Sequence, residues 1–495
     1  MKWFSQILAT VLVALPGAAL GQSVVTYHNS PDRSGHYIVP GLTLSAAPKM
    51  HRDASFNATV SGNVYAQPLY WQAPGESTGI LIVATESNLV YALNATTGAV
   101  VWQTKLAPPA PLSALSCGNI DPEGVTGTPV IDPATGTLYL GAMTLIGGQA
   151  RQKIYALSAS TGKRRAHWPL DVETAMQARK APFESTIQGE RSALQFFKGK
   201  LYVNYGGRYG DCGQYHGTVI EVTPPMAPSA APSITGSWQT RSPGGGIWAQ
   251  GGVATDGTGL FATTGNTFSP STWEDGEAVV RLFPGLARPK PKDYFAPSNW
   301  LTLDNEDRDL GGTEALPFTV PTDAGGTAQR VLALGKDGNA YLLNGANLGG
   351  IGHPLQVLQV SNSVIITEPA IYNAKANTLI AFTNYNGSQP NCSGNNLTML
   401  RVTADTSSPL SIAWCGDLNG GGSPIITTTD GTHSPIAWVV GADGDNKLYG
   451  FNALTGKTLF TSPLSMTGVH HMGTLIAANR HLYIAADGRI YAFAF

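Results

Sequence analysis

Polar side chains recur along the sequence at intervals of about 50 to 60 residues, each beside a short β-prone segment such as Ala66-Gln67-Pro68-Leu69. If these segments converge in space, side chains that are distant in the sequence form one polar ring. Convergent polar groups beside an aromatic surface are typical of a small-ligand pocket. The alternative is that they only hydrogen-bond to channel water and to backbone at the strand ends. The candidate ligand-binding residues are Gln67, Arg191, Trp248, Gln250, Asp309, Glu368 and His471.

The chemistry open to this ring follows from its residue types. Arg191 could bind a carboxylate or a quinone-type anion through two parallel hydrogen bonds, although Glu190 beside it could pair with it instead. Asp309 and Glu368 could bind Ca²⁺ through hard oxygen ligands or act as a base. His470 and His471 are adjacent and would point to opposite faces of a strand, so a two-histidine metal site is not expected. The sequence leaves catalytic residues and metal ligands unidentified.

A repeated hairpin provides the elements that must position this ring. Residues 90–102 predict a strand, a tight turn at Asn94 to Gly98 and a second strand that ends at Trp102. Copies begin at Tyr155 and Tyr449, and in all three the glycine follows the tyrosine by seven residues. Because one hairpin cannot bury its apolar face alone, the copies must pack on one another.

The repeat predicts an all-β, eight-bladed propeller with four-stranded blades. The last blade has only three strands after Met472, so we expect Phe56 to Val60 to complete it and close the ring. The eight predicted blade starts are Gln67, Thr128, Arg191, Gln250, Gly312, Glu368, Ser423 and Met472.

Residues 1–21 have the layout of a secretory signal peptide, with Lys2, an apolar run and Ala19 and Gly21 before the expected cleavage site. The mature chain, 22–495, is expected to be a single propeller domain whose first part, 27–52, is polar and irregular. A secreted protein, extracellular or periplasmic, without an integral membrane segment is predicted.

Four cysteines in an exported chain favour disulfides over metal ligands. Three pairings exist, and loop placement favours Cys392 with Cys415 and Cys117 with Cys212. The net charge of −2 and the 13% of charged residues supply no basic surface, so nucleic acid is not expected as a partner.

The sequence Tyr91-Ala92-Leu93-Asn94-Ala95-Thr96-Thr97-Gly98 with Trp102 resembles the repeat of the pyrroloquinoline-quinone-type, or quinoprotein-like, β-propellers. The resemblance implies that an aromatic residue after each repeat docks on the alanine and glycine of the neighbouring blade, a role for Trp102, Trp168 and Phe460. It also implies pyrroloquinoline quinone with Ca²⁺ as a cofactor of dehydrogenases of this type. The adjacent cysteine pair that many of them carry is missing here.

Loop lengths distinguish the two faces of the ring. Turns between first and second strands and between third and fourth strands are mostly short and define a short-turn face. The remaining loops, such as 107–124 and 288–309, are long and define a long-loop face, where binding is expected. We therefore predict a monomeric module that binds a small molecule or a protein through a polar axial pocket on this face; the alternative is a quinone-dependent alcohol or sugar dehydrogenase.

Overall fold

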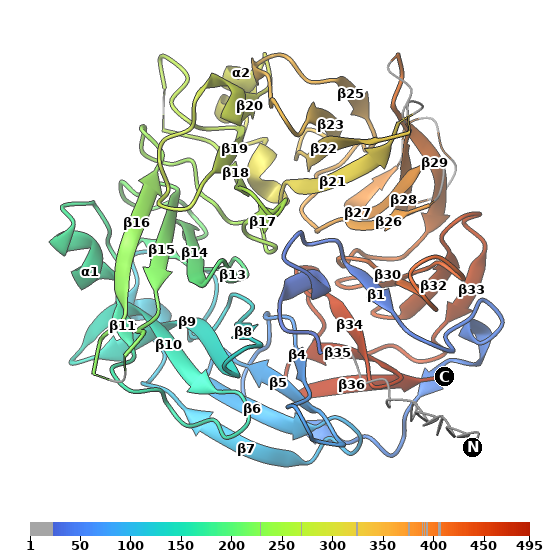
Figure 1. The fold of residues 1–495 in the computed structure, drawn as a ribbon, viewed down its shortest axis with the longest axis horizontal. Coiled ribbons are helices and arrows are strands. Elements are labelled where there is room, and N and C mark those ends of the chain that lie inside the picture. Colours follow the sequence, from blue (N-terminus) through green and yellow to red (C-terminus); the bar gives the residue numbers. More distant parts are fainter. Residues whose placement is uncertain are drawn as a thin grey trace, which may run out of the picture.

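The computed structural model describes residues 23–227, 229–268, 270–322, 325–374, 377–388, 390, 392, 395–403 and 407–495. The predicted signal peptide, residues 1–21, lies outside the described residues. Eight sheets stand around a central axis like the blades of a propeller, which confirms the predicted fold (Figure 1). None of the described helices is long and apolar enough to cross a membrane.

Blades 1 to 4 follow one another along the chain, each with its first strand nearest the axis. Blade 1 is β4 (Leu69–Trp71), β5 (Ile80–Ala84), β6 (Leu89–Asn94) and β7 (Val100–Lys105), and blade 2 is β8 (Val130–Asp132), β9 (Thr137–Ile146), β10 (Gln149–Ser158) and β11 (Leu170–Asp171). Blade 3 is β13 (Gln195–Phe197), β14 (Lys200–Gly207), β15 (Thr218–Thr223) and β16 (Ser233–Gln239), with β12 (Gln188–Gly189) on the end of β14. Blade 4 is β17 (Ala254–Thr255), β18 (Leu260–Thr264), β19 (Ala278–Leu282) and β20 (Tyr294–Ala296), with β24 (Gly350–Ile351) parallel to β20.

Blades 5 to 8 continue the ring. Blade 5 is β21 (Leu316–Pro321), β22 (Thr327–Leu334), β23 (Asn339–Asn344) and β25 (Gln356–Gln359), and blade 6 is β26 (Ala370–Asn373), β27 (Thr378–Ser388), β28 (Asn395–Val402) and β29 (Leu410–Asp417). Blade 7 is β30 (Ile425–Thr428), β31 (Ile436–Val440), β32 (Leu448–Asn452) and β33 (Thr458–Thr461). Blade 8 is β34 (Leu475–Ala478), β35 (His481–Ala486) and β36 (Arg489–Ala494), completed from the N-terminal side of the chain.

Helices occur only between strands in the described part of the chain. The α-helices are α1 (Val172–Ala178) and α2 (Trp300–Asn305), and the short 3₁₀ turns are η1 (Tyr27–Asn29), η2 (Ala47–Lys49), η3 (Leu112–Ala114), η4 (Pro291–Asp293) and η5 (Leu310–Gly312).

The first repeat shows why its residues form a hairpin. The Asn94 side chain accepts hydrogen bonds from the backbone N–H groups of Thr96 and Thr97, both at 2.9 Å, and fixes the turn. Gly98 has a φ of 78°, which an L side chain rarely adopts. The central strand β6 is buried, whereas the outer strand β7 exposes alternate residues, as expected for the edge of a blade.

The ring closes as predicted. Ala58 and Thr59, which form β3, pair antiparallel with Ile490 and Arg489 of β36. The sequence did not indicate that β2 (His51–Arg52) also pairs with β36, farther along the same edge. Closure covers the strand edge that β36 would otherwise expose.

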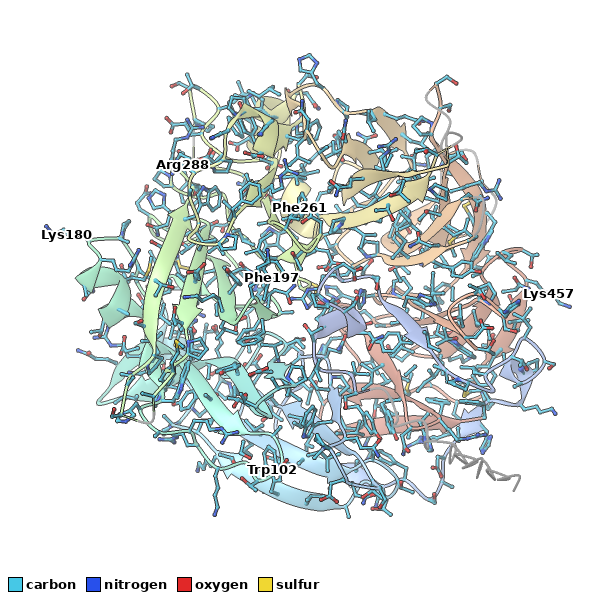
Figure 2. All side chains as sticks on the ribbon, viewed as in Figure 1. Trp102, Lys180, Phe197, Phe261, Arg288 and Lys457 are labelled. Carbon is cyan, nitrogen blue, oxygen red and sulfur yellow. A yellow bond between two sulfur atoms is a disulfide. The ribbon has the colours of Figure 1, made fainter. Side chains whose placement is uncertain are left out.

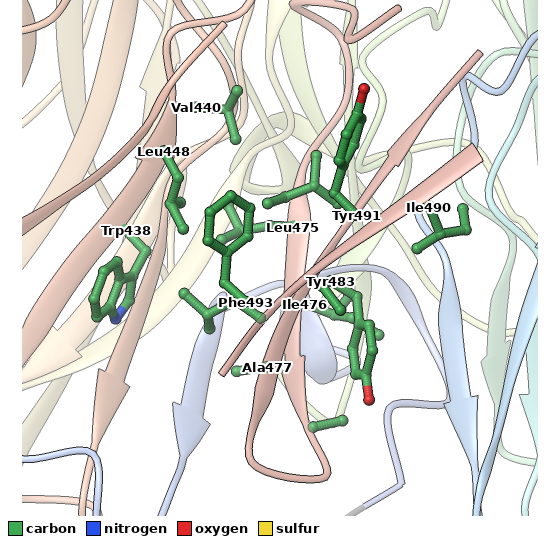
Figure 3. Close-up of a cluster of buried hydrophobic side chains, with 14 of the residues drawn as sticks. Trp438, Val440, Leu448, Leu475, Ile476, Ala477, Tyr483, Ile490, Tyr491 and Phe493 are labelled. Carbon is green, nitrogen blue, oxygen red and sulfur yellow. The ribbon is translucent and has the colours of Figure 1, made fainter. Parts of the chain in front are cut away.

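Apolar side chains fill the space between neighbouring blades. Figure 3 shows one such cluster, in which Trp438 of β31 and Phe493 of β36 point toward the same interior. Phe460 of β33 lies in this cluster with its ring centroid 6.2 Å from that of Trp438. Non-directional packing of this kind holds blades together without a shared sheet.

Trp102 docks on the neighbouring blade. Its Nε1 donates a hydrogen bond of 3.1 Å to the Ala159 carbonyl oxygen, and a Cβ on Gly162 would come within 2.5 Å of the indole. Trp414 of β29, which was not predicted to dock, makes the same contact: its Nε1 donates to the Ala453 carbonyl oxygen at 2.9 Å.

Trp168 makes a different contact from the one expected. It lies before β11 and packs on Tyr139 of its own blade, with ring centroids 5.5 Å apart. In blade 3, Pro224 and Pro225 follow β15 in place of the alanine and glycine of the repeat, and Trp168 instead lies in a buried cluster that also includes Leu201 of blade 3.

The two disulfides join the predicted partners. Cys117, in the link between blades 1 and 2, bonds to Cys212 in a loop of blade 3, and Cys392 bonds to Cys415 within blade 6.

Residues 24–38, here called the N-terminal finger, occupy the centre of the ring, where Figure 1 shows the dark blue start of the described chain. Val24 bridges to Tyr70 of blade 1, and β1 (His36–Ile38) runs parallel to β30 of blade 7. Between these contacts the chain turns inside the channel, with Tyr27 and Arg33 buried. The expectation of an irregular segment at 27–52 was therefore wrong in part, because these polar side chains are ordered by channel walls that no local pattern reveals.

Candidate functional site

A cation packed on an aromatic ring lies at the long-loop end of the axis. The Lys336 Nζ lies 5.1 Å from the centroid of the Trp248 ring and 2.5 Å from the Asp309 Oδ2. The Asp309 Oδ1 accepts a hydrogen bond of 2.8 Å from the backbone N–H of Asn266. Burial raises the pKa of Asp309, although Lys336 opposes this shift. Both carboxylate oxygens of Asp309 are thus engaged by the protein itself.

Two of the predicted pocket residues have structural tasks. The Gln67 Oε1 accepts from the His28 N–H at 2.9 Å, and its Nε2 donates to the Thr26 carbonyl oxygen at 3.2 Å, so Gln67 holds the N-terminal finger. The Glu368 Oε1 and Oε2 accept from the backbone N–H groups of Gly251 and Glu314 at 2.8 and 2.7 Å. Glu368 is fully buried and ties blade 6 to the starts of blades 4 and 5.

The adjacent histidines contact different partners. The His471 Nδ1 hydrogen-bonds to the Asp443 carboxylate, whereas the His470 Nε2 lies 2.9 Å from the Asp487 Oδ1. The His470 ring also stacks on Tyr65, with centroids 4.4 Å apart. The two side chains do not converge, in agreement with the argument against a two-histidine metal site.

Arg191 differs from its neighbours because its guanidinium makes no hydrogen bond and no ion pair with any residue in the described part of the chain. Burial lowers its pKa, while more distant groups, Asp211 and Tyr215 first among them, raise it. A recess beside it is lined by Glu123, Arg208 and Tyr209. In this recess Glu123 already pairs with Arg208, so Arg191 is a partly desolvated cation that lacks a counter-charge at contact distance.

Glu190 does not provide that counter-charge. Its carboxyl group is buried against Gly127 and Gly141, where an added Cβ would come within 2.0 and 2.6 Å of its oxygens. Burial raises the pKa of Glu190 well above its usual value, and the nearby Glu86 raises it further. Glu190 forms no ion pair with Arg191 in the part of the chain that the structure describes, so the alternative of an Arg191–Glu190 pair does not hold.

Gln250, like Arg191, has a side-chain polar group without a hydrogen-bond partner among the described residues. This group is the side-chain Oε1 of Gln250, which is buried. Its backbone carbonyl oxygen accepts from the Ala193 N–H at 2.7 Å, so the residue itself is fixed. Of the seven predicted residues, Arg191, Trp248 and Gln250 retain surface or polar atoms that a ligand could use.

Lys336 was not among the predicted site residues, because those were taken from the starts of the innermost strands. Lys336 follows β22 in the tight turn Gly335-Lys336-Asp337-Gly338, a loop between second and third strands. Loops of this kind lie on the long-loop face, so a search that included them would have found this residue.

A calcium ion does not fit the carboxylates of this site. Within the described ranges, no group of three His, Cys, Asp or Glu side chains is placed to hold a metal ion. Asp309 is neutralised by Lys336, and Glu368 is saturated by backbone donors. All four cysteines are in disulfides, so none is free for chemistry at the axis.

Comparison with known proteins agrees with the geometry of the ring. Residues 51–204 match the sequence model of a family described as outer membrane protein assembly factor BamB. No curated protein sequence matches the chain.

Solved structures of propellers match most of the chain. The quinohemoprotein alcohol dehydrogenase of Comamonas testosteroni is 15% identical with a TM-score of 0.62, over 95% of this chain and 80% of that one. A europium-containing methanol dehydrogenase is 14% identical with a TM-score of 0.59, over 96% and 98%. BamB of Moraxella catarrhalis is 13% identical with a TM-score of 0.51, over 89% and 99%. These identities establish the fold and leave the activity open. The chain is thus an eight-bladed β-propeller, and the match of residues 51–204 is consistent with the pyrroloquinoline-quinone-type repeat that its sequence resembles.

Proposed function

We propose that this protein is an exported ligand-binding module whose axial pocket on the long-loop face takes a small organic anion with a flat ring. The observation that carries the proposal is the unpaired guanidinium of Arg191. A partly desolvated arginine binds a carboxylate more strongly than a fully solvated arginine does. Its planar guanidinium can also donate to both carboxylate oxygens.

Trp248 and Gln250 define the rest of the proposed ligand. The indole of Trp248 offers a flat apolar surface, and one side of it is already held by Lys336. The buried Oε1 of Gln250 accepts hydrogen bonds and so favours a ligand with a hydroxyl or N–H donor. A planar aromatic carboxylate with one such donor meets these three requirements.

A quinone polycarboxylate is also a planar aromatic carboxylate. The positive charges of Arg191 and Lys336 would attract its negative charges. Because the carboxylates offer no calcium site, we assign no redox step to the pocket, and dehydrogenase activity becomes an outcome of the test.

Export is proposed from the two disulfides together with the leader-like sequence before residue 22. The mature chain, 22–495, is taken as one propeller domain and as a monomer, as predicted from the sequence.

The test is isothermal titration calorimetry of the full mature chain against aromatic mono- and dicarboxylates and pyrroloquinoline quinone, with and without Ca²⁺. We expect binding that Arg191→Gln and Trp248→Leu each weaken at least about tenfold. Arg164→Gln is the matched control, because Arg164 lies over the Tyr155 ring but is exposed on the outer part of blade 2.

Binding that is unchanged in Arg191→Gln would refute the site. Dye reduction with an alcohol or a sugar in the presence of quinone and Ca²⁺ would refute the non-catalytic assignment in favour of a dehydrogenase.

A further inference from the structure

A second cavity lies at the opposite, short-turn end of the axis. It has a volume of about 550 Å³, within the range of about 300 to 1,000 Å³ that is usual for small-molecule sites. Its walls come from the N-terminal finger and from blades 3 to 6. The finger contacts blades 1 and 7 through Val24 and β1, and its Pro31 and Ser34 carbonyl oxygens accept from backbone N–H groups of blades 4 and 6, so the finger itself forms one wall of this space.

Three phenylalanines from different blades give the cavity its apolar surface. Phe197 ends the first strand of blade 3, Phe261 belongs to β18 of blade 4, and Phe318 belongs to β21 of blade 5. Figure 2 shows Phe197 and Phe261 close to the centre of the ring, far from the rim residues Trp102 and Lys457. Phe197 is half-buried and Phe318 is 9% exposed, so both rings are held in place while part of their surface faces the cavity.

Two carboxylates supply hydrogen-bond acceptors. The Asp256 Oδ1 accepts from the backbone N–H groups of Thr258 and Gly259, both at 2.8 Å, which fixes the carboxylate on its turn. The Asp32 Oδ1, on the finger, accepts from the Ser34 N–H at 3.1 Å. The Oδ2 atoms of Asp32 and Asp256 accept no hydrogen bond from the residues that the structure describes.

Arg330 supplies donors on the wall formed by blade 5. Its Nη1 donates to the Gln329 carbonyl oxygen at 3.0 Å, whereas its Nε is buried without a partner among the described residues. Among the described residues, the guanidinium is not paired with Asp32 or Asp256, although all three residues line the same space. An unsatisfied buried donor in a cavity of this size points to a ligand or to water.

The charges of the wall narrow the class of ligand. The two carboxylates disfavour an anionic ligand, and Arg330 offsets one of their two charges, so that the wall attracts a cationic ligand only weakly. The remaining lining side chains are mostly hydroxyls, amides and aromatic rings. Hydroxyl groups can donate to the carboxylates and accept from Arg330, and the apolar C–H face of a pyranose ring can pack on phenylalanine.

We propose that this cavity binds a neutral saccharide, with Asp256 and Arg330 contacting its hydroxyl groups and Phe197 packing on its ring. The site is separate from the pocket at the long-loop end and does not depend on the function proposed for it.

The experiment compares three sugars that share one ring and differ in charge: glucose, glucosamine and glucuronate, with cellobiose and maltose as longer neutral probes. Binding to the full mature chain is followed by saturation-transfer difference NMR and titration calorimetry. We expect a neutral sugar to bind more tightly than both charged analogues.

Asp256→Asn is the most specific variant, because asparagine keeps the Oδ1 that fixes the turn and replaces only the free oxygen. We expect it to raise the Kd about tenfold, and Phe197→Ala to do the same. Asp430→Asn is the matched control: Asp430 begins the turn Asp430-Gly431-Thr432 in blade 7, accepts from the Thr432 N–H at 2.9 Å and does not line the cavity.

Three results would overturn the proposal: no binding of any neutral sugar, a preference for glucosamine or glucuronate, or binding that Asp256→Asn and Phe197→Ala leave unchanged. Arg191→Gln should not alter sugar binding, so a failure at this cavity and a failure at the long-loop pocket are distinguished by separate variants.

Discussion

The Arg33 Nη2 donates a hydrogen bond of 3.1 Å to the Leu194 carbonyl oxygen, which joins the N-terminal finger to the first strand region of blade 3. The Nη1 of the same guanidinium donates to the Thr26 Oγ1 at 2.6 Å. Arg33 therefore stabilises the turn within the N-terminal finger and joins the finger to the channel wall.

Replacement of Arg33 by methionine should lower the free energy of unfolding by about 2 to 4 kcal/mol, because it leaves buried acceptors without donors. Urea denaturation measures the change. Lys457→Met, on the exposed rim, serves as control and should leave stability within about 0.5 kcal/mol of the parent. An Arg33→Met protein as stable as the parent would mean that the finger contributes little to the fold.

Deletion of residues 23–60 should sharply lower the melting temperature and promote aggregation, because it empties the channel and exposes the edge of β36. Scanning calorimetry and light scattering measure both effects. A shorter deletion of 23–38 keeps β2 and β3, so it measures the contribution of the N-terminal finger to stability apart from that of ring closure. If the longer deletion melted like the parent, the closing strand would not stabilise the ring.

Trp102→Ala and Trp414→Ala should each destabilise the protein by about 3 kcal/mol, because both indoles pack on a glycine of the next blade and donate to its backbone. Trp102→Phe keeps an aromatic ring but loses the Nε1 donor. Its loss of stability should therefore be smaller, about 1 kcal/mol, the cost of the missing hydrogen bond. Chemical denaturation of the three variants distinguishes the two contributions. Equal stability of Trp102→Ala and the parent would contradict the docking role.

Glu86 should make stability depend on pH. Burial raises its pKa to about 7, so the folded protein holds a proton that the unfolded chain releases near the usual value. The stabilisation is fully present below the unfolded pKa and is lost as the pH rises through about 7. This one group should therefore cost roughly 3 kcal/mol of stability between about pH 4.5 and pH 8.

Glu86→Gln removes that titration and keeps an acceptor for the Gly124 N–H, which now donates to the Glu86 Oε2 at 2.6 Å. Relative to the parent, the variant should gain roughly 2.5 kcal/mol of stability between about pH 5 and pH 8. Urea titrations at both pH values test this, with the exposed Glu76→Gln as control. A parent–variant difference that does not change with pH would show that Glu86 ionises normally.

The repeat alone was sufficient to predict the ring, because blade identity is a local property. The hairpin around Asn94 and Gly98 is fixed by turn chemistry within a few residues, and the spacing of the blade starts gave eight blades. Because the last blade has only three strands of its own and an open edge must be covered, the sequence also predicted that Phe56 to Val60 closes the ring.

The sequence was also sufficient to predict polar residues at the axis, because the start of each blade lies near the centre of the ring. What the sequence could not decide is which of these groups are already engaged. Gln67 and Glu368 resemble Arg191 in position, yet two of the three are saturated by the N-terminal finger and by backbone N–H groups.

Only the tertiary structure decided this, because the partners lie far away in the sequence. Gln67 meets His28 across 39 residues, and Glu368 meets Gly251 across 117. The N-terminal finger inside the channel carries no periodic pattern, because its polar side chains bond to the surrounding blades and not only to neighbours along the chain. The cavity beside Asp256 follows from where that one segment inserts.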